Sequence, residues 1–402
     1  MNPVLMTRAL DVLGEGRTYP ILYNDDVNVP AVAHAFDVTE EEAQRYLPYG
    51  CGEYALDSTS VGSPNCALST IKSLEAVLHN GRDGITGEKL GLATGDLSSF
   101  KTFDDLWNAY ARQIEHHARC LARRHAIEYE MERTSAAFLG VSMLYDHCLE
   151  RGRSLVDGGA KYRGAVFESF AMVNTADSLT VIKDLVYDRK LMTLERLVAA
   201  LDADFNGYGP EHRLMLAVPK FGNDDERADA MARRVSDHLS SFCRGLAREV
   251  GLDYVLIVNI NNHMNVGFGR EAAASADGRR KGSPVANGMT PTAGNDTCGV
   301  TALLNSLSSV SPSCHAGYTH NLKFSRRMFT EERRSLEALL DAYWAKGGTQ
   351  AMLSVVDRGE MEQAVREPGK YRNLIVRVGG FSARFVDLAP DIQQDLISRT
   401  LY

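Results

Sequence analysis

The sequence predicts an α/β fold in which helix outweighs strand. Short apolar runs rich in β-branched residues recur along the 402 residues, and such runs are typical of buried strands. They lie at 166–173, 254–260, 351–356 and 373–378. Long helical patterns separate them, most clearly at 103–149 and 226–250. Strands that alternate with long helices favour parallel pairing and right-handed crossovers.

The N-terminal part of the chain begins with a turn-rich loop and a short helix. Residues 39–42, Thr-Glu-Glu-Glu, have the spacing of a capping box, so a helix should begin there and end before Pro48. A loop at 48–54 follows, in which Cys51 stands between two glycines. The apolar spacing at 67–78 then predicts another helix.

The remainder of the chain alternates helices with strands and turns. Helices are expected at 178–188, 194–203, 226–250 and 330–344, and a last one near Pro390. Residues 267–299 are rich in turn formers and predict a loop. The sequence contains no internal repeat and no obvious linker, so we expect one contiguous body.

The composition is that of an ordinary globular protein, with a formal charge of −8. No block of lysine or arginine suggests binding to nucleic acid. No apolar run is long enough to span a bilayer, and residues 1–8 lack the features of a secretory signal. We therefore predict a cytoplasmic protein with no nucleic-acid or membrane partner.

The seven cysteines are scattered and form no C-x-x-C pair, which argues against both a disulfide framework and a zinc ribbon. A reducing cytoplasm fits this usage. His116, His117 and Cys120 share helical spacing, but no carboxylate-rich ligand set accompanies them. We interpret these three as solvated or core residues, and we expect no metal site.

The loop around Cys51 is the first candidate for chemistry. The glycines on either side let the backbone turn sharply and leave the sulfur open, and Glu53 can act as an acid or base beside it. An isolated loop cysteine is more often structural. A nearby carboxylate raises the pKa of a thiol, so thiolate chemistry is disfavoured. Hydrogen-atom chemistry, which needs no thiolate, fits this loop better.

A second candidate lies near the C-terminus, where the apolar run 374–378 leads into Gly379 and Gly380 and then Phe381. The run predicts a buried strand, and the glycine pair predicts a turn or a place of close approach. A strand end with a tight turn is the simplest interpretation of this stretch by itself.

Two motifs together resemble the glycyl radical enzyme family, the relatives of pyruvate formate-lyase and of the radical dehydratases. They are Gly50-Cys51-Gly52-Glu53 and Arg377-Val378-Gly379-Gly380-Phe381-Ser382. Further segments resemble family landmarks in the right order, at 19–25, 219–225, 276–280 and 386–388. The resemblance covers nearly the whole chain and matches the C-terminal half of the longer family members.

The resemblance implies half of the family's α/β barrel, in which a cysteine finger loop meets a C-terminal glycine loop. Gly380 would store the radical, Cys51 would become a thiyl radical, and Glu53 would be the general base. Residues 1–270 would be the C-terminal part of a pyruvate formate-lyase-like barrel domain, and 271–402 a contiguous glycine radical domain. No cofactor would be bound, because a radical S-adenosylmethionine iron–sulfur activating enzyme installs the radical after translation.

The resemblance leaves three functions open. Radical elimination of a carbon–oxygen or carbon–nitrogen bond, as in the glycerol, propanediol and choline lyases, ranks first. A formate C-acetyltransferase-like carbon–carbon lyase ranks second, because pyruvate formate-lyase carries two adjacent cysteines and here Gly50 precedes Cys51. A non-catalytic or repair subunit that binds a longer relative ranks third, because short spare parts lack the cysteine loop. The substrate stays open, since Gly52 stands where valine is commoner.

The length of the chain predicts partners. A half-barrel alone leaves sheet edges and apolar faces exposed, so we expect either an N-terminal half or a partner chain, together with a homodimer. The activating enzyme and a small-molecule substrate complete the expected partners. His263, Asn65 and Asp57 are further residues that could point toward the site.

Overall fold

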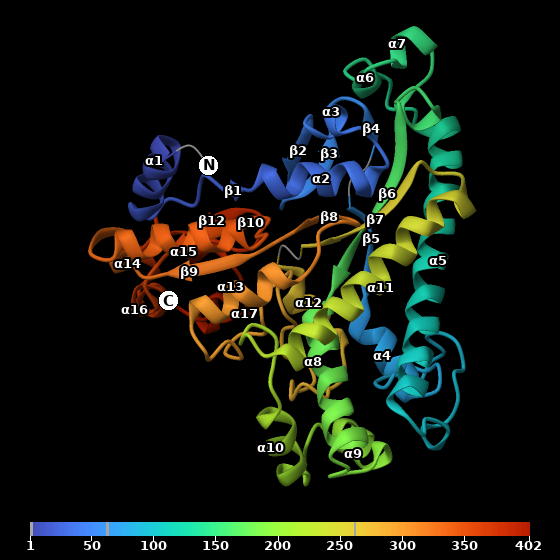
Figure 1. Ribbon diagram of the computed structural model, residues 1–402, viewed down its shortest axis with the longest axis vertical. Coiled ribbons are helices and arrows are strands. Elements are labelled where there is room, and N and C mark those ends of the chain that lie inside the picture. Colours follow the sequence, from blue (N-terminus) through green and yellow to red (C-terminus); the bar gives the residue numbers. More distant parts are fainter. Residues whose placement is uncertain (1–2, 62–63, 261–262) are drawn as a thin grey trace.

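The computed structural model describes residues 3–61, 64–260 and 263–402 (Figure 1). Its centre is a five-stranded sheet in which every pairing is parallel. The long central strand β6 pairs with β4 and β5 along one edge and with β7 along the other, and β8 follows β7. The strands are β4 (Ser60–Val61), β5 (Pro64–Ser69), β6 (Tyr162–Phe170), β7 (Tyr254–Asn259) and β8 (His315–Tyr318). The predicted α/β class is confirmed.

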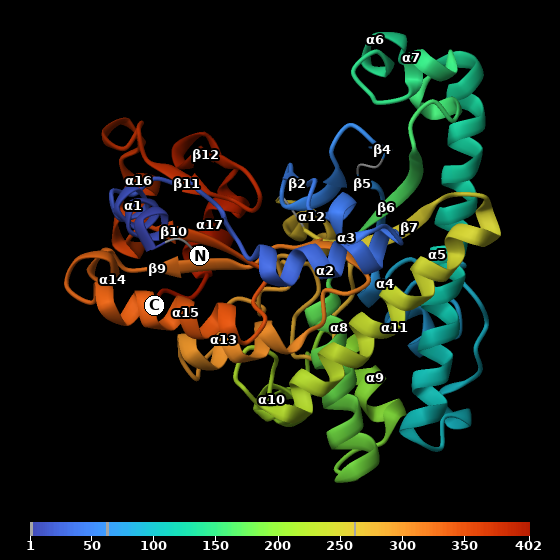
Figure 2. The ribbon, with the colours of Figure 1, turned by 45° about the horizontal axis from the view of Figure 1, so that its top comes forward.

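Helices cover one face of this sheet and pack into the largest core. Ala165 and Phe167 of β6 point into that core, and so do side chains of the four crossover helices. These helices are α4 (Thr70–Leu78), α5 (Phe103–Ser135), α8 (Met172–Ile182) and α11 (Glu226–Val250). Figure 2 shows α5 and α11 crossing on this side of the strands.

The opposite face of the sheet carries a smaller apolar cluster. Val166 of β6 and Leu256 and Val258 of β7 point to this side, as the alternation of side chains along a strand requires. Helix α2 (Asp25–Phe36) and the hairpin formed by β2 (Tyr46–Tyr49) and β3 (Glu53–Leu56) pack on them. This face therefore brings the N-terminal hairpin to the sheet.

The C-terminal third forms a second, smaller region beside α1 (Figure 1). Its sheet has the order β1–β10–β9, with β1 antiparallel and β9 parallel to β10, and a separate hairpin joins β11 to β12. The strands are β1 (Leu22–Tyr23), β9 (Asn321–Phe324), β10 (Gln350–Val355), β11 (Ile375–Arg377) and β12 (Ser382–Arg384). Because β1 pairs with β10, the N-terminal segment is fixed to the C-terminal region.

The other α-helices complete the chain. They are α1 (Pro3–Gly14), α3 (Glu40–Ala43), α6 (Leu139–Ser142), α7 (Cys148–Arg151), α9 (Leu194–Asp202), α10 (Gly209–Ala217), α12 (Met264–Glu271), α13 (Val300–Ser309), α14 (Arg326–Thr330), α15 (Arg333–Ala345), α16 (Arg358–Arg366) and α17 (Pro390–Ser398). No helix in the described part of the chain is long and apolar enough to cross a membrane.

Several predicted elements differ from the observed ones. The helix expected at 67–78 begins only at Thr70, capped by Ser69, because the residues before it pair with β6 as strand β5. The helix expected at 103–149 ends at Ser135 and is followed by two short helices. The loop expected at 48–54 is a hairpin turn between two strands.

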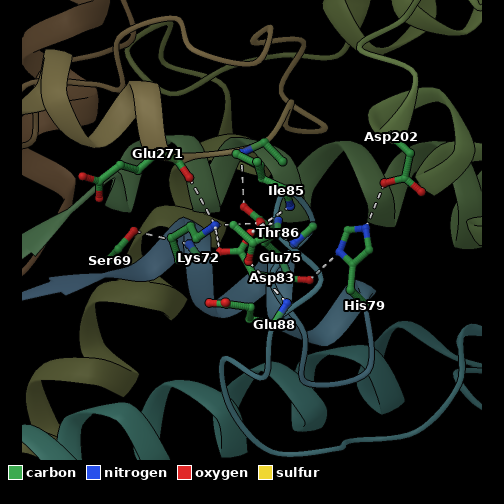
Figure 3. A network of polar contacts seen from close by, with 12 residues as sticks. Ser69, Lys72, Glu75, His79, Asp83, Ile85, Thr86, Glu88, Asp202 and Glu271 are labelled. Atoms are coloured by element: carbon green, nitrogen blue, oxygen red, sulfur yellow. Dashed lines mark hydrogen bonds and ion pairs between the residues drawn. The ribbon is translucent and has the colours of Figure 1, made fainter.

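A polar network ties α4 to the loop after it (Figure 3). The Lys72 ammonium lies 2.7 Å from Glu75 Oε1 and 2.6 Å from Asp83 Oδ2. Glu75 also accepts hydrogen bonds from the backbone N–H groups of Gly84 and Ala273. Lys72, Glu75 and Asp83 are thus paired within the chain, and their contacts support the junction between α4 and the loop that follows it.

Candidate active site

Cys51 lies at the tip of the β2–β3 hairpin. The strands pair from Tyr46 with Leu56 to Tyr49 with Glu53, which leaves a tip of residues 50–52. Gly50 has φ +53° and Gly52 has φ +116°, in the left-handed region that glycine adopts without strain. The side chain of Cys51 is buried, with 7% of its surface exposed.

The tip of this hairpin presses against the C-terminal half of the chain. A Cβ on Gly52 would lie 2.4 Å from Gln350 Nε2, and one on Gly317 would lie 2.3 Å from the carbonyl oxygen of Gly52. The Thr319 hydroxyl donates to the carbonyl oxygen of Cys51 at 3.2 Å. Gly317 is therefore needed because β8 approaches the backbone of the tip too closely for a side chain, whereas the atom nearest to Gly52 is the end of the Gln350 side chain.

The glycine pair near the C-terminus forms the tip of the β11–β12 hairpin, whose last pair joins Arg377 to Ser382. A Cβ built on Gly380 would lie 2.0 Å from Cβ and 2.4 Å from Sγ of Cys51. The α-carbon of Gly380 and the thiol of Cys51 are thus in direct contact. Two hairpin tips from opposite ends of the sequence meet at this point.

Arg377 holds the glycine hairpin in place. Its Nη1 donates to the carbonyl oxygen of Gly380 at 3.2 Å, and its Nη2 donates to the carbonyl oxygen of Thr18. The guanidinium lies 4.5 Å from the centre of the Tyr19 ring. The Ser382 hydroxyl adds a hydrogen bond to Thr18 Oγ1 at 2.7 Å. The N-terminal segment therefore fixes the glycine loop against Cys51.

The surroundings keep the Cys51 thiol protonated. Burial raises its pKa to about 12, and the negative charges of Glu53 and Glu168 add to this shift. The reactive form of Cys51 near neutral pH is therefore S–H, which can transfer a hydrogen atom.

Glu53 lies beside the thiol and is 5% exposed. Burial raises the pKa of its carboxyl group, and the backbone N–H groups of Glu53, Cys51 and Gly52 act in the opposite direction. In the described part of the chain, Glu53 Oε2 has no hydrogen-bond partner. A buried carboxylate with a free oxygen and a raised pKa is suited to accept a proton from a bound hydroxyl group.

The structure brings together Gly380, Cys51 and Glu53. The suggestion that Asp57 points toward the site is wrong, because Asp57 is exposed and follows the end of β3 that lies away from the tip. His263 is exposed, and its ring lies 6.1 Å from that of Phe381, next to the glycine loop. The side chain of Asn65 lies outside the described residues.

Sequence reasoning missed three residues at this site. Gln350 Nε2 donates to the Tyr23 hydroxyl at 3.2 Å, and both side chains lie against the tip of the cysteine hairpin. Burial raises the pKa of Tyr23 to about 12. The third is Glu168 of β6, on the sheet face that packs against α2 and the β2–β3 hairpin. A glutamate inside the apolar run 165–170 was the signal that could have revealed it.

On α5, the side chain of His117 makes polar contacts within the chain, whereas Cys120 is exposed. His117 Nδ1 lies 2.8 Å from the Ser73 hydroxyl, and its Nε2 lies 3.1 Å from the carbonyl oxygen of Leu90. Among the described residues, no group of three or more His, Cys, Asp or Glu side chains has a geometry that could hold a metal ion.

Comparison with known proteins identifies relatives over the whole chain. A family model described as pyruvate formate lyase-like matches residues 1–267, and one described as glycine radical matches residues 285–386. The chain is 32% identical to (2S)-3-sulfopropanediol dehydratase from Klebsiella oxytoca, over 98% of this chain and 49% of that protein. It is also 32% identical to isethionate sulfite-lyase from Desulfovibrio desulfuricans, over 96% of this chain and 47% of that protein.

Solved structures agree with this result. The structure that describes 1,2-propanediol dehydration in Roseburia inulinivorans superimposes with a TM-score of 0.95 at 31% identity, over 100% of this chain and 51% of that one. The B12-independent glycerol dehydratase from Clostridium butyricum gives a TM-score of 0.95 at 29% identity, with the same coverage of both chains. The chain thus spans about half the length of these relatives.

Proposed function

This chain belongs to the glycyl radical enzyme family, and on that premise we propose that it carries the radical-bearing half of an enzyme that cleaves a carbon–oxygen or carbon–nitrogen bond in a small hydroxylated substrate. The observation that carries the proposal is the contact between Gly380 and the Cys51 thiol, where a Cβ on the glycine would lie 2.4 Å from Sγ. A glycine α-carbon radical beside a neutral thiol can exchange a hydrogen atom with it directly.

The proposed cycle uses three groups of this chain. The Gly380 radical takes the hydrogen atom of the Cys51 S–H, and the resulting thiyl radical takes one from the substrate carbon that bears a hydroxyl group. Glu53 accepts the proton of that hydroxyl, the neighbouring carbon–heteroatom bond breaks, and the leaving group departs with the bonding pair and regains a proton. Cys51 then returns its hydrogen atom to the product radical, and Gly380 recovers the radical from Cys51.

Elimination is preferred over acyl transfer because of the residue before Cys51. An acyl-transferring relative needs a second thiol there, and Gly50 supplies no nucleophile. We further propose that a radical S-adenosylmethionine iron–sulfur activating enzyme installs the radical on Gly380. Residues 1–270 and 271–402 would act as one contiguous unit rather than as independent domains, since β1 pairs with β10 across this division.

Glu53→Gln should stop elimination without preventing radical formation. Glutamine keeps the volume and hydrogen bonds of the side chain but cannot accept the substrate proton, and loss of a general base lowers turnover by about 10²- to 10⁴-fold. The assay uses the activated chain together with the polypeptide that supplies the other half of the fold. It follows product release from propanediol, glycerol, hydroxyproline, isethionate and sulfopropanediol.

Glu41→Gln is the matched control, since Glu41 is an exposed glutamate on α3. It should leave turnover unchanged. Electron paramagnetic resonance (EPR) of each sample measures the radical, so a loss of turnover can be assigned to the base rather than to activation. Full turnover of the glutamine variant would rule out Glu53 as the base.

We also propose that the other half of the relatives' fold, on the same polypeptide or on a partner chain, covers surfaces that this half leaves open. Strand β5 pairs only with β6 among the described strands, so its other edge is free. Helices α6 and α7 project away from the sheet (Figure 1) and form part of an exposed apolar surface. That surface includes Ile127, Met131, Phe138, Leu139, Val141, Met143, Leu144 and Leu149.

The chain produced by itself should therefore self-associate, and Leu139→Glu with Leu144→Glu should reduce this. These side chains are 70% and 77% exposed, and burying a leucine at an interface contributes about 1.5–3 kcal/mol. Sedimentation velocity would measure the monomer fraction. Val365→Glu, at an exposed valine of α16, is the control and should have no effect. Equal association of both variants would contradict a role for the α6–α7 surface.

A further inference from the structure

A second carboxylate faces the proposed site from the sheet. Side chains of β6 alternate between its two faces, with Phe167 in the helical core and Val166 in the cluster that contains Cys51. Glu168 lies two residues after Val166 along β6, so its side chain is on the same face of the sheet as that of Val166. The β6–β7 register is continuous from Gly164 to Glu168, so no bulge reverses this alternation.

The neighbours of Glu168 do not neutralise it. Its partners across the sheet are Ala67 and Val258, which carry no charge. Among the described residues no lysine, arginine or histidine forms an ion pair with it, whereas the charge of Glu53 acts on it directly. Burial and the charge of Glu53 raise the pKa of Glu168 to about 7.

The other charged or titratable groups at this point are Cys51, Tyr23 and Arg377. The thiol and the phenol are neutral at pH 7, because burial raises the pKa of each to about 12. Arg377 is the one cation among the groups that act on Cys51, and its guanidinium is already bonded to the carbonyl oxygens of Gly380 and Thr18. The charges that act on Cys51 therefore come from two carboxyl groups and from one guanidinium, which keeps its positive charge although it donates to two neutral carbonyl oxygens.

We propose that Glu53 and Glu168 form a carboxylate pair beside Cys51, and that this pair makes the site select uncharged or cationic substrates over anionic ones such as sulfonates. The inference rests on the proposed function for its meaning in catalysis. The physical basis is that each carboxylate near Cys51 disfavours a further negative charge there, so removal of the Glu168 charge should favour anionic molecules relative to neutral ones. Glu168 is thus a specificity-determining residue.

The charge selectivity of Cys51 alkylation tests the pair without requiring turnover. The unactivated chain is treated at pH 8 with iodoacetamide, which is neutral, or with iodoacetate, which is anionic, and the modification of each cysteine is followed by mass spectrometry. The ratio of the two rates at Cys51 should exceed that at the exposed Cys120 and Cys298, which report the intrinsic ratio. Glu168→Gln should lower the ratio at Cys51 by about 3- to 10-fold, as expected for removing one nearby charge.

Glu195→Gln, an exposed glutamate on α9, is the matched control and should leave the ratio unchanged. A ratio at Cys51 equal to that at Cys298 in the unmodified chain would overturn the proposal. So would a high ratio that Glu168→Gln does not lower, since the selectivity would then come from Glu53 alone.

Stability against pH gives a second readout in case the buried thiol reacts too slowly. A carboxyl whose pKa is raised in the folded state holds a proton that the unfolded chain has already lost, so stability falls as the pH rises from about 4.5 to about 7. Glu168→Gln should therefore raise the urea midpoint more at pH 8 than at pH 5. An equal change at both pH values would show that folding does not raise the pKa of Glu168, and it would overturn the proposal. Neither readout requires a radical, so failure of the proposed function and failure of the pair are distinguishable.

Discussion

Gly380→Ala should leave the chain without any EPR signal after anaerobic incubation with a radical S-adenosylmethionine activating enzyme, whereas the unmodified chain should give a doublet. A glycine α-carbon radical is stabilised by both flanking amides, which requires a nearly planar carbon and is easiest without a Cβ. The remaining α-hydrogen splits the signal into two lines. An added methyl group would also lie 2.0 Å from Cα and Cβ of Cys51, so the two hairpin tips would have to separate.

Gly369→Ala provides the matched control for this substitution. A Cβ on Gly369, in the same C-terminal region, would meet no atom within 4 Å. This variant should keep the full doublet. Exposure of the activated samples to oxygen gives an independent reading, because a radical at Gly380 should lead to chain cleavage there and release of the short C-terminal tail. A doublet or a released tail from Gly380→Ala would place the radical elsewhere.

The sequence predicted those parts of the fold that local patterns determine. The strands at 254–260 and 351–356 and the long helix at 226–250 match β7, β10 and α11 closely, because apolar runs and amphipathic spacing are local properties. The helix predicted at 67–78 includes the last three residues of β5, because these residues continue directly into α4 and only pairing with β6 makes them a strand. That pairing joins residues far apart in sequence, which no local pattern reveals.

The same distinction between local patterns and long-range pairing applies to the residues of the candidate site. Cys51, Glu53 and Gly380 lie in motifs that can be recognised in sequence, and the structure brings their hairpins together. Gln350 lies on a strand whose neighbours follow only from sheet pairing, so its place at the site could not be derived. Glu168 is conspicuous as a glutamate in an apolar run, but the face on which it lies also depends on the pairing of β6. The direction of Asp57 depends on the pairing of β2 with β3, which the sequence does not reveal. Once β3 is known, Asp57 lies at the end of the hairpin away from Cys51.

Cys51→Ser should keep the Gly380 doublet but abolish turnover of every substrate. Serine has nearly the same shape, and Thr319 can still donate to the carbonyl oxygen of residue 51. The O–H bond is much stronger than the S–H bond, so a glycine radical cannot take a hydrogen atom from serine. Activation would therefore be normal, while the relay to the substrate would be lost.

Deuterated solvent separates a lost relay from a merely distorted site. The Cys51 proton exchanges with solvent, so reversible transfer between Cys51 and Gly380 should replace the glycine α-hydrogen by deuterium and collapse the doublet of the unmodified chain to a single line. In Cys51→Ser the doublet should persist in deuterated solvent. Cys298→Ser, at an exposed cysteine, should collapse like the unmodified chain. Collapse in Cys51→Ser at the unmodified rate would mean that the hydrogen atom reaches Gly380 by another route, and the contact between the two hairpin tips would not be the path of the radical.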